Sequence, residues 1–152
     1  AQKFALIDME YILKNIPAYQ SASNELNQVS KQWQNEVEKL GKEAKSLYDS
    51  YQASVKTLSD AQKTKKEEEI VAKEKSAAEL RRKYFGPEGE LFKKREALMQ
   101  PIQDEIYEAV KAISTQKGYA VVVDRASASS IIFASPNIDI SNEVLAKLGY
   151  SN

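Results

Sequence analysis

The sequence predicts a mainly α-helical protein with a small β body, an α+β fold in which a long antiparallel helical hairpin (a tentacle) projects from a small β-strand head. Residues 18–117 favour helix almost throughout, because they are rich in Ala, Leu, Glu, Lys and Gln and contain only three glycines and two prolines. Strand-like runs of β-branched residues lie towards the two ends of the chain. A continuous helix of this length exceeds the core of a small domain, so the stretch must fold back on itself or leave the body.

Composition restricts the classes of function. The net charge is zero by count, which gives no global bias towards nucleic acid or an acidic membrane. The chain has no cysteine and no histidine, so disulfides, His-ligated zinc and Ser-His or Cys-His catalysis are excluded. No apolar run approaches the roughly 20 residues that span a bilayer. We therefore expect a protein that is not an enzyme and has no transmembrane segment.

The first seventeen residues predict a strand and a short helix. Residues 4–7 are apolar and indicate a buried strand. Asp8 suits the N-cap of a short helix that runs through Leu13, because its carboxylate can accept a hydrogen bond from a free amide of the first turn. Pro17 suits the first position of the next helix, where its missing N–H costs nothing.

The first arm of the hairpin carries a heptad pattern. One set of residues recurs every seven positions, and a companion set lies four positions on. The two sets are Leu26, Trp33, Leu40 and Leu47, and Val37, Ala44, Tyr51 and Leu58. This alternating spacing is typical of a coiled-coil seam, so we expect this face to pack along another helix.

Two positions compete for the tip of the hairpin. Ser59 and Gln62 form a capping-box signal for a new helix, which favours a turn near residues 57–61. Residues 85–89 must also break or kink the helix, because Pro87 removes a backbone donor. A tip near Ser59 gives arms of about 40 and 55 residues, whereas a tip at Gly86 gives about 67 and 28. We therefore prefer the first position and interpret residues 85–89 as a break within the second arm.

The second arm changes character along its length. Residues 60–83 are polar on nearly every face, which predicts a solvated helix. Apolar residues return between residues 91 and 113, so we expect this part to pack against the body, with a bend at Pro101.

The C-terminal segment predicts two strands and a helix. Gly118 is a good helix stop, and residues 119–124 indicate a strand. Residues 131–134 indicate a second strand. Residues 142–148 predict a last helix, with Ser141 as its N-cap and Gly149 as its stop.

The predicted division places residues 1–17 and 118–152 in a β-rich head for oligomerisation, and residues 18–117 in the arm. A head of about fifty residues buries too little surface to be stable alone. Its strands would also have exposed edges, which several copies could cover by sharing their strands. The residues expected at this interface are Val121, Val123, Ile131 and Phe133.

The arrangement resembles the Skp/OmpH family of periplasmic chaperones. The resemblance rests on Leu6-Ile7-Asp8-Met9, the charged hairpin, Val121-Val122-Val123-Asp124 and the segment Asp139 to Leu145, and it covers the whole chain in order and spacing. It implies a homotrimer with a β-rich body and three helical tentacles around a cavity. It also implies an ATP-independent holdase that keeps unfolded outer-membrane β-barrel proteins from aggregating. The break at residues 85–89 and the neutral charge depart from the family pattern.

The same resemblance implies a location and partners. The location would be the periplasm, for a mature chain after signal-peptide removal. The partners would be unfolded outer-membrane proteins and further copies of the chain, with no nucleic acid and at most a weak contact with a membrane surface. No cofactor is expected, since the chain lacks a phosphate-binding loop of the Gly-x-x-x-x-Gly-Lys type.

Widely spaced apolar side chains along the arms are the candidate client-binding residues. They are Tyr48, Tyr51, Leu58, Ile70 and Tyr84. Their spacing gives many weak contacts and no rigid pocket, which suits clients that share no sequence. The alternative is a structural or adaptor coiled-coil hairpin that docks on a partner helix without unfolded clients.

Two further groups of acidic residues are better explained by structural roles than by a catalytic or metal-binding role. The carboxylates of residues 67–69 lie on a solvated helix with no apolar pocket to shift their pKa, which favours a charged surface over a catalytic site. Asp8 and Asp124 each end a predicted strand, where caps and turn bonds are commoner than a metal or an acid pair.

Overall fold

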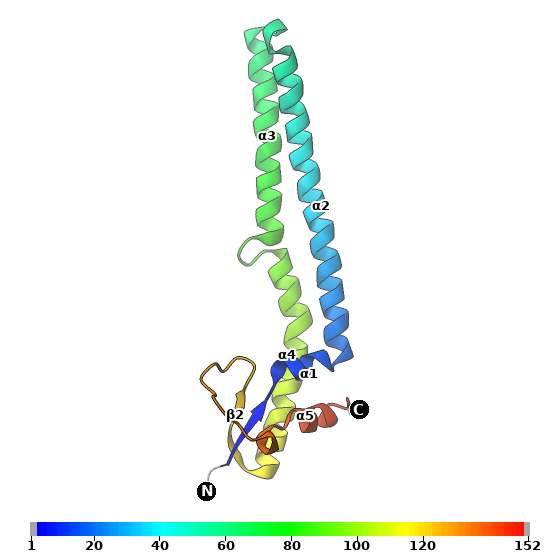
Figure 1. The fold of residues 1–152 in the computed structure, drawn as a ribbon. Coiled ribbons are helices and arrows are strands. Elements are labelled where there is room, and N and C mark those ends of the chain that lie inside the picture. The colour runs from blue at the N-terminus through cyan, green and yellow to red at the C-terminus, as the bar shows by residue number, and fades with distance from the viewer. Residues whose placement is uncertain (1–2, 151–152) are drawn as a thin grey trace. The chain divides into compact units, whose positions relative to one another are not determined.

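A computed structural model describes residues 3–150 (Figure 1). In chain order its elements are β1 (Lys3–Ile7), α1 (Met9–Lys14), α2 (Pro17–Ser54), the 3-10 turn η1 (Val55–Thr57), α3 (Asp60–Phe85), α4 (Glu90–Lys117), β2 (Tyr119–Asp124), the 3-10 turn η2 (Pro136–Ile138) and α5 (Ser141–Lys147). This is the predicted mainly α fold, with a long helical hairpin and a small two-stranded sheet, and it confirms the fold class.

The described chain divides into two compact units. The first, which we call the head unit, is formed by the described parts of Ala1–Asn24 and Glu96–Asn152. The second, the arm unit, is Glu25–Arg95. These boundaries lie inside the predicted arm of residues 18–117, because the bases of both long helices contribute apolar side chains to the head core.

The head core packs the sheet against helical side chains. Its members are Ala5, Ile7, Ile12, Ile16, Ala22, Ile102, Ile106, Ala109, Ile113, Ile140, Val144 and Leu145. Ala22 belongs to α2, and the apolar face between Ile102 and Ile113 belongs to α4. A head of strands and short helices alone would lack this surface, so the long helices complete its core.

The two strands of the head unit pair in parallel. Phe4 lies opposite Val121 and Ile7 opposite Asp124, with an irregularity after Lys3. On its other side, β1 makes a single bridge from Leu6 to Asp139. Within residues 3–150, β2 therefore pairs with β1 alone, and its outer edge has no strand partner.

The helix ends in the head unit follow the sequence signals with one exception. The Asp8 carboxylate accepts from the Tyr11 N–H at 3.1 Å, and α2 begins at Pro17, so both predictions are confirmed. Gly118 follows the end of α4 with a φ of 77°, which glycine adopts without a Cβ clash, so the predicted stop is also confirmed.

The prediction that Ser141 caps the last helix is wrong. The cap position is Ile140, and Ser141 is the first residue of α5. The Ser141 hydroxyl instead accepts from the distant Asp8 N–H at 2.8 Å, while its own N–H donates to the Asp139 carboxylate at 2.9 Å. A serine just before a helix resembles an N-cap in sequence. Here, however, its hydroxyl accepts a hydrogen bond from the backbone amide of Asp8, 133 residues away in the chain.

Backbone groups at the C-terminal end of β1 form hydrogen bonds with the end of β2 and with the segment before α5. The Met9 N–H donates to the Asp124 carboxylate at 3.0 Å, and the Ile140 N–H donates to the Leu6 carbonyl at 2.8 Å. Asp124 also accepts from the Ala126 N–H at 3.0 Å. The two strand-end aspartates thus serve as cap and turn acceptors, as the sequence favoured.

The predicted strand at residues 131–134 is absent from the structure. Residues 131–135 have no regular structure, and the Ile131 N–H donates within its own loop, to the Ala128 carbonyl at 3.5 Å. β-branched residues form a strand only where a neighbouring edge supplies hydrogen bonds, and this segment pairs with none of the described strands. Two of its apolar side chains are left exposed, Ile132 at 100% and Phe133 at 84%.

Ile106→Ala is expected to destabilise the head unit much more than a substitution of an exposed neighbour. Ile106 is fully buried, and removing three carbons from a packed core typically costs about 2–5 kcal/mol. Denaturant unfolding followed by circular dichroism measures the loss. The control is Tyr107→Ala at the next position, where the side chain is 55% exposed and a loss below about 1 kcal/mol is expected. Equal losses for the two variants would contradict this description of the core.

Candidate functional site

The arm unit is an antiparallel pair of helices in which α3 returns along α2. In the side-chain contacts between the two arms, the residue number of one partner increases as that of the other decreases. The pairs are Tyr51 with Glu67, Glu43 with Lys73, Glu36 with Tyr84 and, from α4, Glu25 with Lys94. Figure 1 shows the same arrangement, with α2 and α3 side by side.

The chain reverses through η1 and an N-terminal cap on α3. The Gln62 N–H donates to the Ser59 hydroxyl at 3.2 Å, and the Ser59 N–H donates to the Gln62 side-chain oxygen at 2.9 Å. This is the capping box that the sequence signal predicts. It satisfies two free amides at the start of α3, which gives the helix a defined first residue after the turn.

The heptad pattern of α2 forms the inner face of the hairpin. Leu26, Val37 and Ala44 are buried, and the remaining predicted seam positions are half-buried. A two-helix seam covers each side chain on one side only, which explains the partial burial.

The matching pattern of α3 was missed by the sequence analysis. Ile70 is buried, and Ala77 and Tyr84 follow at seven-residue spacing, both half-buried. Lys63 and Lys73 occupy other inward positions and are half-buried as well. Lysine can cover apolar surface with its alkyl stem while its ammonium reaches water, so a charged sequence still forms a seam. The seven-residue spacing of Ile70, Ala77 and Tyr84 is the signal that would have revealed it.

An aromatic cluster of Trp33, Tyr84 and Phe85 joins α2 to the end of α3. The Trp33 and Tyr84 rings are stacked, with centroids 4.6 Å apart and planes at 4°. Phe85 meets the edge of Tyr84 at 6.3 Å. The Tyr84 hydroxyl donates to the Glu36 carboxylate at 2.5 Å, and this hydrogen bond raises the pKa of Tyr84, with desolvation adding to it. Such stacking contributes about 0.5–1.5 kcal/mol beyond area burial.

The helix break follows this cluster directly. α3 ends at Phe85 and α4 begins at Glu90, and between them Glu88 adopts a φ of 56°. A Cβ at Gly86 would lie 2.5 Å from the Arg82 carbonyl oxygen, and one at Gly89 would lie 2.8 Å from that of Lys83. The loop therefore requires glycine at both positions.

The five predicted client-binding residues all lie in the arm unit, but they are not brought together. Tyr48 is exposed at 46%, and Leu58 is half-buried beside the turn. Tyr51 is half-buried and donates to Glu67, which raises its pKa. Ile70 is only 7% exposed, and Tyr84 belongs to the aromatic cluster, so these two side chains are used within the hairpin.

The four predicted interface residues lie in the head unit, on β2 and the segment after it. Val121 is 46% exposed and Phe133 is 84% exposed, while Val123 and Ile131 are half-buried. The sequence analysis did not single out two further exposed apolar side chains, Phe4 and Ile132, at 56% and 100%.

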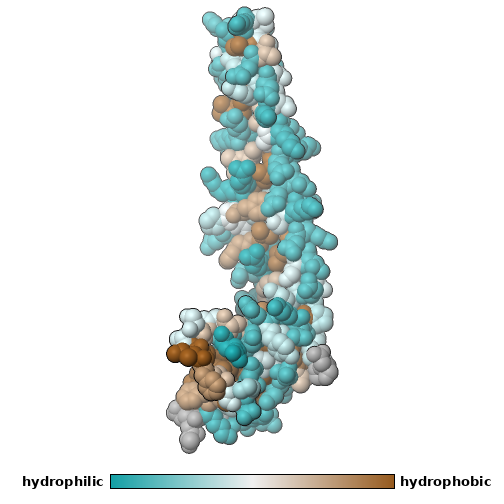
Figure 2. Space-filling model, in the orientation of Figure 1, coloured by the Kyte–Doolittle hydropathy of each residue, from teal (hydrophilic) through white to brown (hydrophobic). Residues whose placement is uncertain are grey.

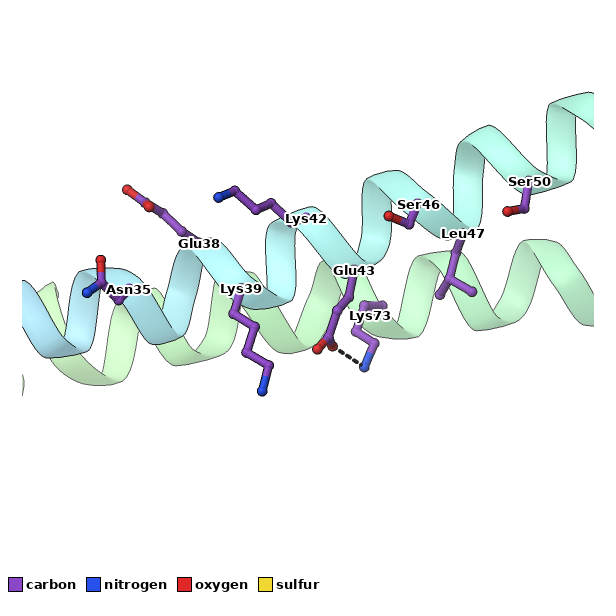
Figure 3. Close-up of a pocket in the computed structure, with 9 residues that line it drawn as sticks. All are labelled: Asn35, Glu38, Lys39, Lys42, Glu43, Ser46, Leu47, Ser50 and Lys73. Atoms are coloured by element: carbon purple, nitrogen blue, oxygen red, sulfur yellow. Dashed lines mark ion pairs between the residues drawn. The ribbon is translucent and has the colours of Figure 1, made fainter.

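The surface of the arm offers a shallow depression along α2 rather than a closed pocket (Figure 3). It has a volume of about 810 Å³ and is lined by Asn35, Glu38, Lys39, Lys42, Glu43, Ser46, Leu47, Ser50 and Lys73. Glu43 and Lys73 form an ion pair at 2.8 Å, and the hydrogen bond from Lys73 lowers the pKa of Glu43. A carboxylate held ionised in open solvent is unsuited to general acid catalysis.

Figure 2 shows the arm as a mostly hydrophilic surface with separate hydrophobic patches. Among residues 3–150, no group of three or more His, Cys, Asp or Glu side chains is placed to hold a metal ion. None of the described helices combines the length and the apolar character needed to cross a membrane. The described arm therefore presents charged side chains with apolar ones dispersed between them.

The raised pKa values of the hairpin tyrosines predict a loss of stability at alkaline pH. A Tyr84 that is neutral and bonded to Glu36 stabilises the fold fully below the ordinary tyrosine pKa of about 10, and this contribution disappears as the pH rises through the higher folded value. Thermal unfolding followed by circular dichroism between pH 8 and 12 measures it.

In the variant Tyr84→Phe the alkaline loss should be smaller than in the parent, because the titrating hydroxyl is gone. Tyr48→Phe is the matched control, because the Tyr48 hydroxyl accepts from the neutral amide of Gln52. It should keep the parent's alkaline slope. An unchanged slope in Tyr84→Phe would show that the bond to Glu36 does not contribute to stability.

Comparison with known proteins places the whole described fold in one family. The sequence model of the family described as outer membrane protein (OmpH-like) matches residues 3–148. A protein named chaperone protein Skp from Photorhabdus luminescens is 23% identical over 157 residues, covering 97% of this chain and 86% of the relative. A protein of the same name from Yersinia enterocolitica is 23% identical over 150 residues, covering 97% and 87%.

A solved structure shares the fold as well. The crystal structure of an OmpH-like protein from Caulobacter crescentus CB15 superposes with a TM-score of 0.76, at 13% sequence identity, over 97% of this chain and 84% of that one. The family resemblance inferred from the sequence is confirmed by the match over residues 3–148, and this chain belongs to the OmpH-like family of outer membrane proteins, which includes the Skp chaperones.

Proposed function

We propose that this protein is an ATP-independent holdase that binds unfolded outer-membrane β-barrel proteins in a cavity between helical arms and prevents their aggregation. The observation that carries the proposal is the alignment of proteins named chaperone protein Skp over 97% of the chain, together with a long, charged helical hairpin. We also propose a non-enzymatic role in the periplasm, for a mature chain after signal-peptide removal.

The chemistry of the arm suits clients that share no sequence. Exposed apolar side chains are spread along it rather than gathered, including Tyr48, Val71 and Phe92 at 46%, 61% and 50% exposure. Spread contacts of this kind bind weakly and tolerate variation. Several arms around one client would add their weak contacts, so that useful affinity arises without a pocket. Charged side chains between them keep the loaded complex soluble.

Among the five residues expected from sequence, Tyr48, Tyr51 and Leu58 offer surface to a client in the closed hairpin, being exposed or half-buried. Ile70 and Tyr84 would reach a client only where the hairpin opens, because the seam already uses them. The proposed contact surface is therefore centred on the distal half of α2 and the turn.

The adaptor alternative is less well supported. It requires a heptad face that is free to accept a partner helix. In the arm unit, α3 already covers the seam of α2 from Tyr51 to Glu36, and Lys94 of α4 continues the contacts to Glu25. The remaining faces of both helices are charged, which favours solvent over a second coiled-coil partner.

Assembly into a homotrimer is proposed from the edge of the sheet. In the described chain, the outer edge of β2 has no strand partner. Val121 is exposed on β2 itself, and Phe133 is exposed in the segment that follows it. An unpaired edge and exposed apolar side chains are both unfavourable in water, and shared strands would cover both. The proposed interface residues remain Val121, Val123, Ile131 and Phe133.

Shortening the arm tests the holdase. Deleting residues 47–69 and joining Ser46 to Ile70 by a four-residue turn keeps the Glu43–Lys73 pair and the aromatic cluster, because it removes facing parts of both helices. The variant should lose most of the parent's ability to suppress light scattering by a diluted, unfolded β-barrel protein. Native mass measurement checks that its assembly is unchanged. A shortened arm that protects as well as the parent would contradict the proposed mechanism.

Phe133→Asp tests the trimer. Burying an unpaired carboxylate in a shared core costs on the order of several kcal/mol per chain. The expected result is a shift from trimer to monomer in native mass measurement. Ser129→Asp, in the exposed part of the same loop, is the control and should remain trimeric. A Phe133→Asp protein that is trimeric and as heat-stable as the parent would place this residue outside the interface.

A further inference from the structure

The aromatic cluster and the helix break are adjacent features of the arm unit. Tyr84 and Phe85 are the last two residues of α3, and the break begins at Gly86. The stack between Tyr84 and Trp33 and the bond from Tyr84 to Glu36 both attach this helix end to α2. The strongest side-chain attachment of α3 therefore lies immediately beside the point where its backbone is interrupted.

The rest of α3 is held more weakly. Ile70 is the only buried residue of the helix, and Ala77 and Leu80 are half-buried. Its polar contacts with α2 outside the cluster are the ion pair from Lys73 to Glu43, with side chains exposed at 35% and 39%, and the exposed hydrogen bond from Tyr51 to Glu67. Such contacts contribute little in water. Within the described residues, the only aromatic pairs are those of the cluster.

At the break, the ends of α3 and α4 are closed by separate backbone hydrogen bonds. On the α3 side the Gly86 N–H donates to the Arg82 carbonyl at 2.8 Å, and on the α4 side the Lys93 N–H donates to the Gly89 carbonyl at 3.0 Å. Each helix thus closes its own end. A rotation within the loop would break the turn bond from the Gly89 N–H to the Gly86 carbonyl, at 2.9 Å, but would leave both helix-end bonds intact, so that motion at this point melts neither helix.

We propose that the stack of Tyr84 on Trp33 is a latch, and that the loop from Gly86 to Gly89 is its hinge. In the closed state the latch holds the C-terminal turns of α3 on α2. In the open state these turns detach and pivot about the loop, while α2 remains continuous. Opening changes the separation of the two helices at one defined place and exposes the ring faces of Trp33 and Tyr84. The latch belongs to the free protein and does not depend on the proposed client.

The latch is coupled to the loop by packing as well as by sequence. In the closed loop, a Cβ added to Gly89 would lie 2.8 Å from the Lys83 carbonyl oxygen and 2.9 Å from the Gly86 carbonyl oxygen. Gly89→Ala therefore forces the loop away from its closed form. Since Lys83 directly precedes Tyr84, the same displacement is expected to loosen the stack.

The first experiment uses backbone hydrogen exchange on the full chain. In Tyr84→Ala, exchange at residues 81–85 should accelerate by on the order of tenfold, since the stack and the bond to Glu36 are both lost. Exchange at residues 62–70 should stay as in the parent. Tyr48→Ala removes an exposed tyrosine from the same hairpin and should change neither segment. Unchanged exchange at residues 81–85, or equal acceleration along all of α3, would overturn the latch.

The second experiment uses Trp33, the only tryptophan of the chain, as a reporter of the stack. Tyr84→Ala should shift its emission to the red, towards that of an indole in water. Tyr84→Phe keeps the ring and should keep the parent emission. Gly89→Ala, with the cluster intact, should shift the emission in the same direction as Tyr84→Ala. If Gly89→Ala leaves both the emission and the exchange at residues 81–85 unchanged, the loop is not the hinge.

Discussion

The parallel pairing of β1 with β2 is the constraint on which the organisation of the chain depends. Parallel strands cannot be joined by a tight turn, so the chain between them must leave and return. In most folds a single helix makes this crossover. Here the connection runs from Asp8 to Gly118 and consists almost entirely of helix. The pairing also brings together the C-terminal ends of both strands, where the Asp8 N–H donates to the Ser141 hydroxyl and the Met9 N–H donates to the Asp124 carboxylate.

A crossover this long must be stable without a core of its own. The arm unit achieves this by a narrow seam to which α2 contributes Leu26, Val37 and Ala44 and α3 contributes Ile70 and its heptad neighbours, supplemented by lysine stems. A seam of two helices leaves the other faces to water, which accounts for the charged surface. The same geometry leaves apolar side chains dispersed and partly exposed, and this dispersion is the physical basis of the proposed holdase.

The head unit, unlike the arm unit, has a core but leaves a strand edge and apolar side chains uncovered. Its core is completed by the bases of α2 and α4, yet among residues 3–150 the outer edge of β2 has no strand partner, and Ile132 and Phe133 are exposed. An apolar loop in water beside an unpaired strand is unfavourable for a monomer. This is the physical argument for assembly, and it is independent of the argument from the arm. The proposed client-binding surface and the proposed assembly surface thus belong to different units of the chain.

Local signals in the sequence determined the elements whose causes are local. The capping box at Ser59, the cap at Asp8, the start at Pro17 and the stop at Gly118 each depend on bonds within a few residues, and all are present. The heptads of α2 are equally local. Tertiary structure alone decided where distant groups compete: Ser141 bonds to Asp8 instead of capping α5, and residues 131–134 find no strand edge. It also assigned the bases of the long helices to the head core, because burial depends on which surfaces meet after the chain has folded back, and sequence spacing does not contain that information.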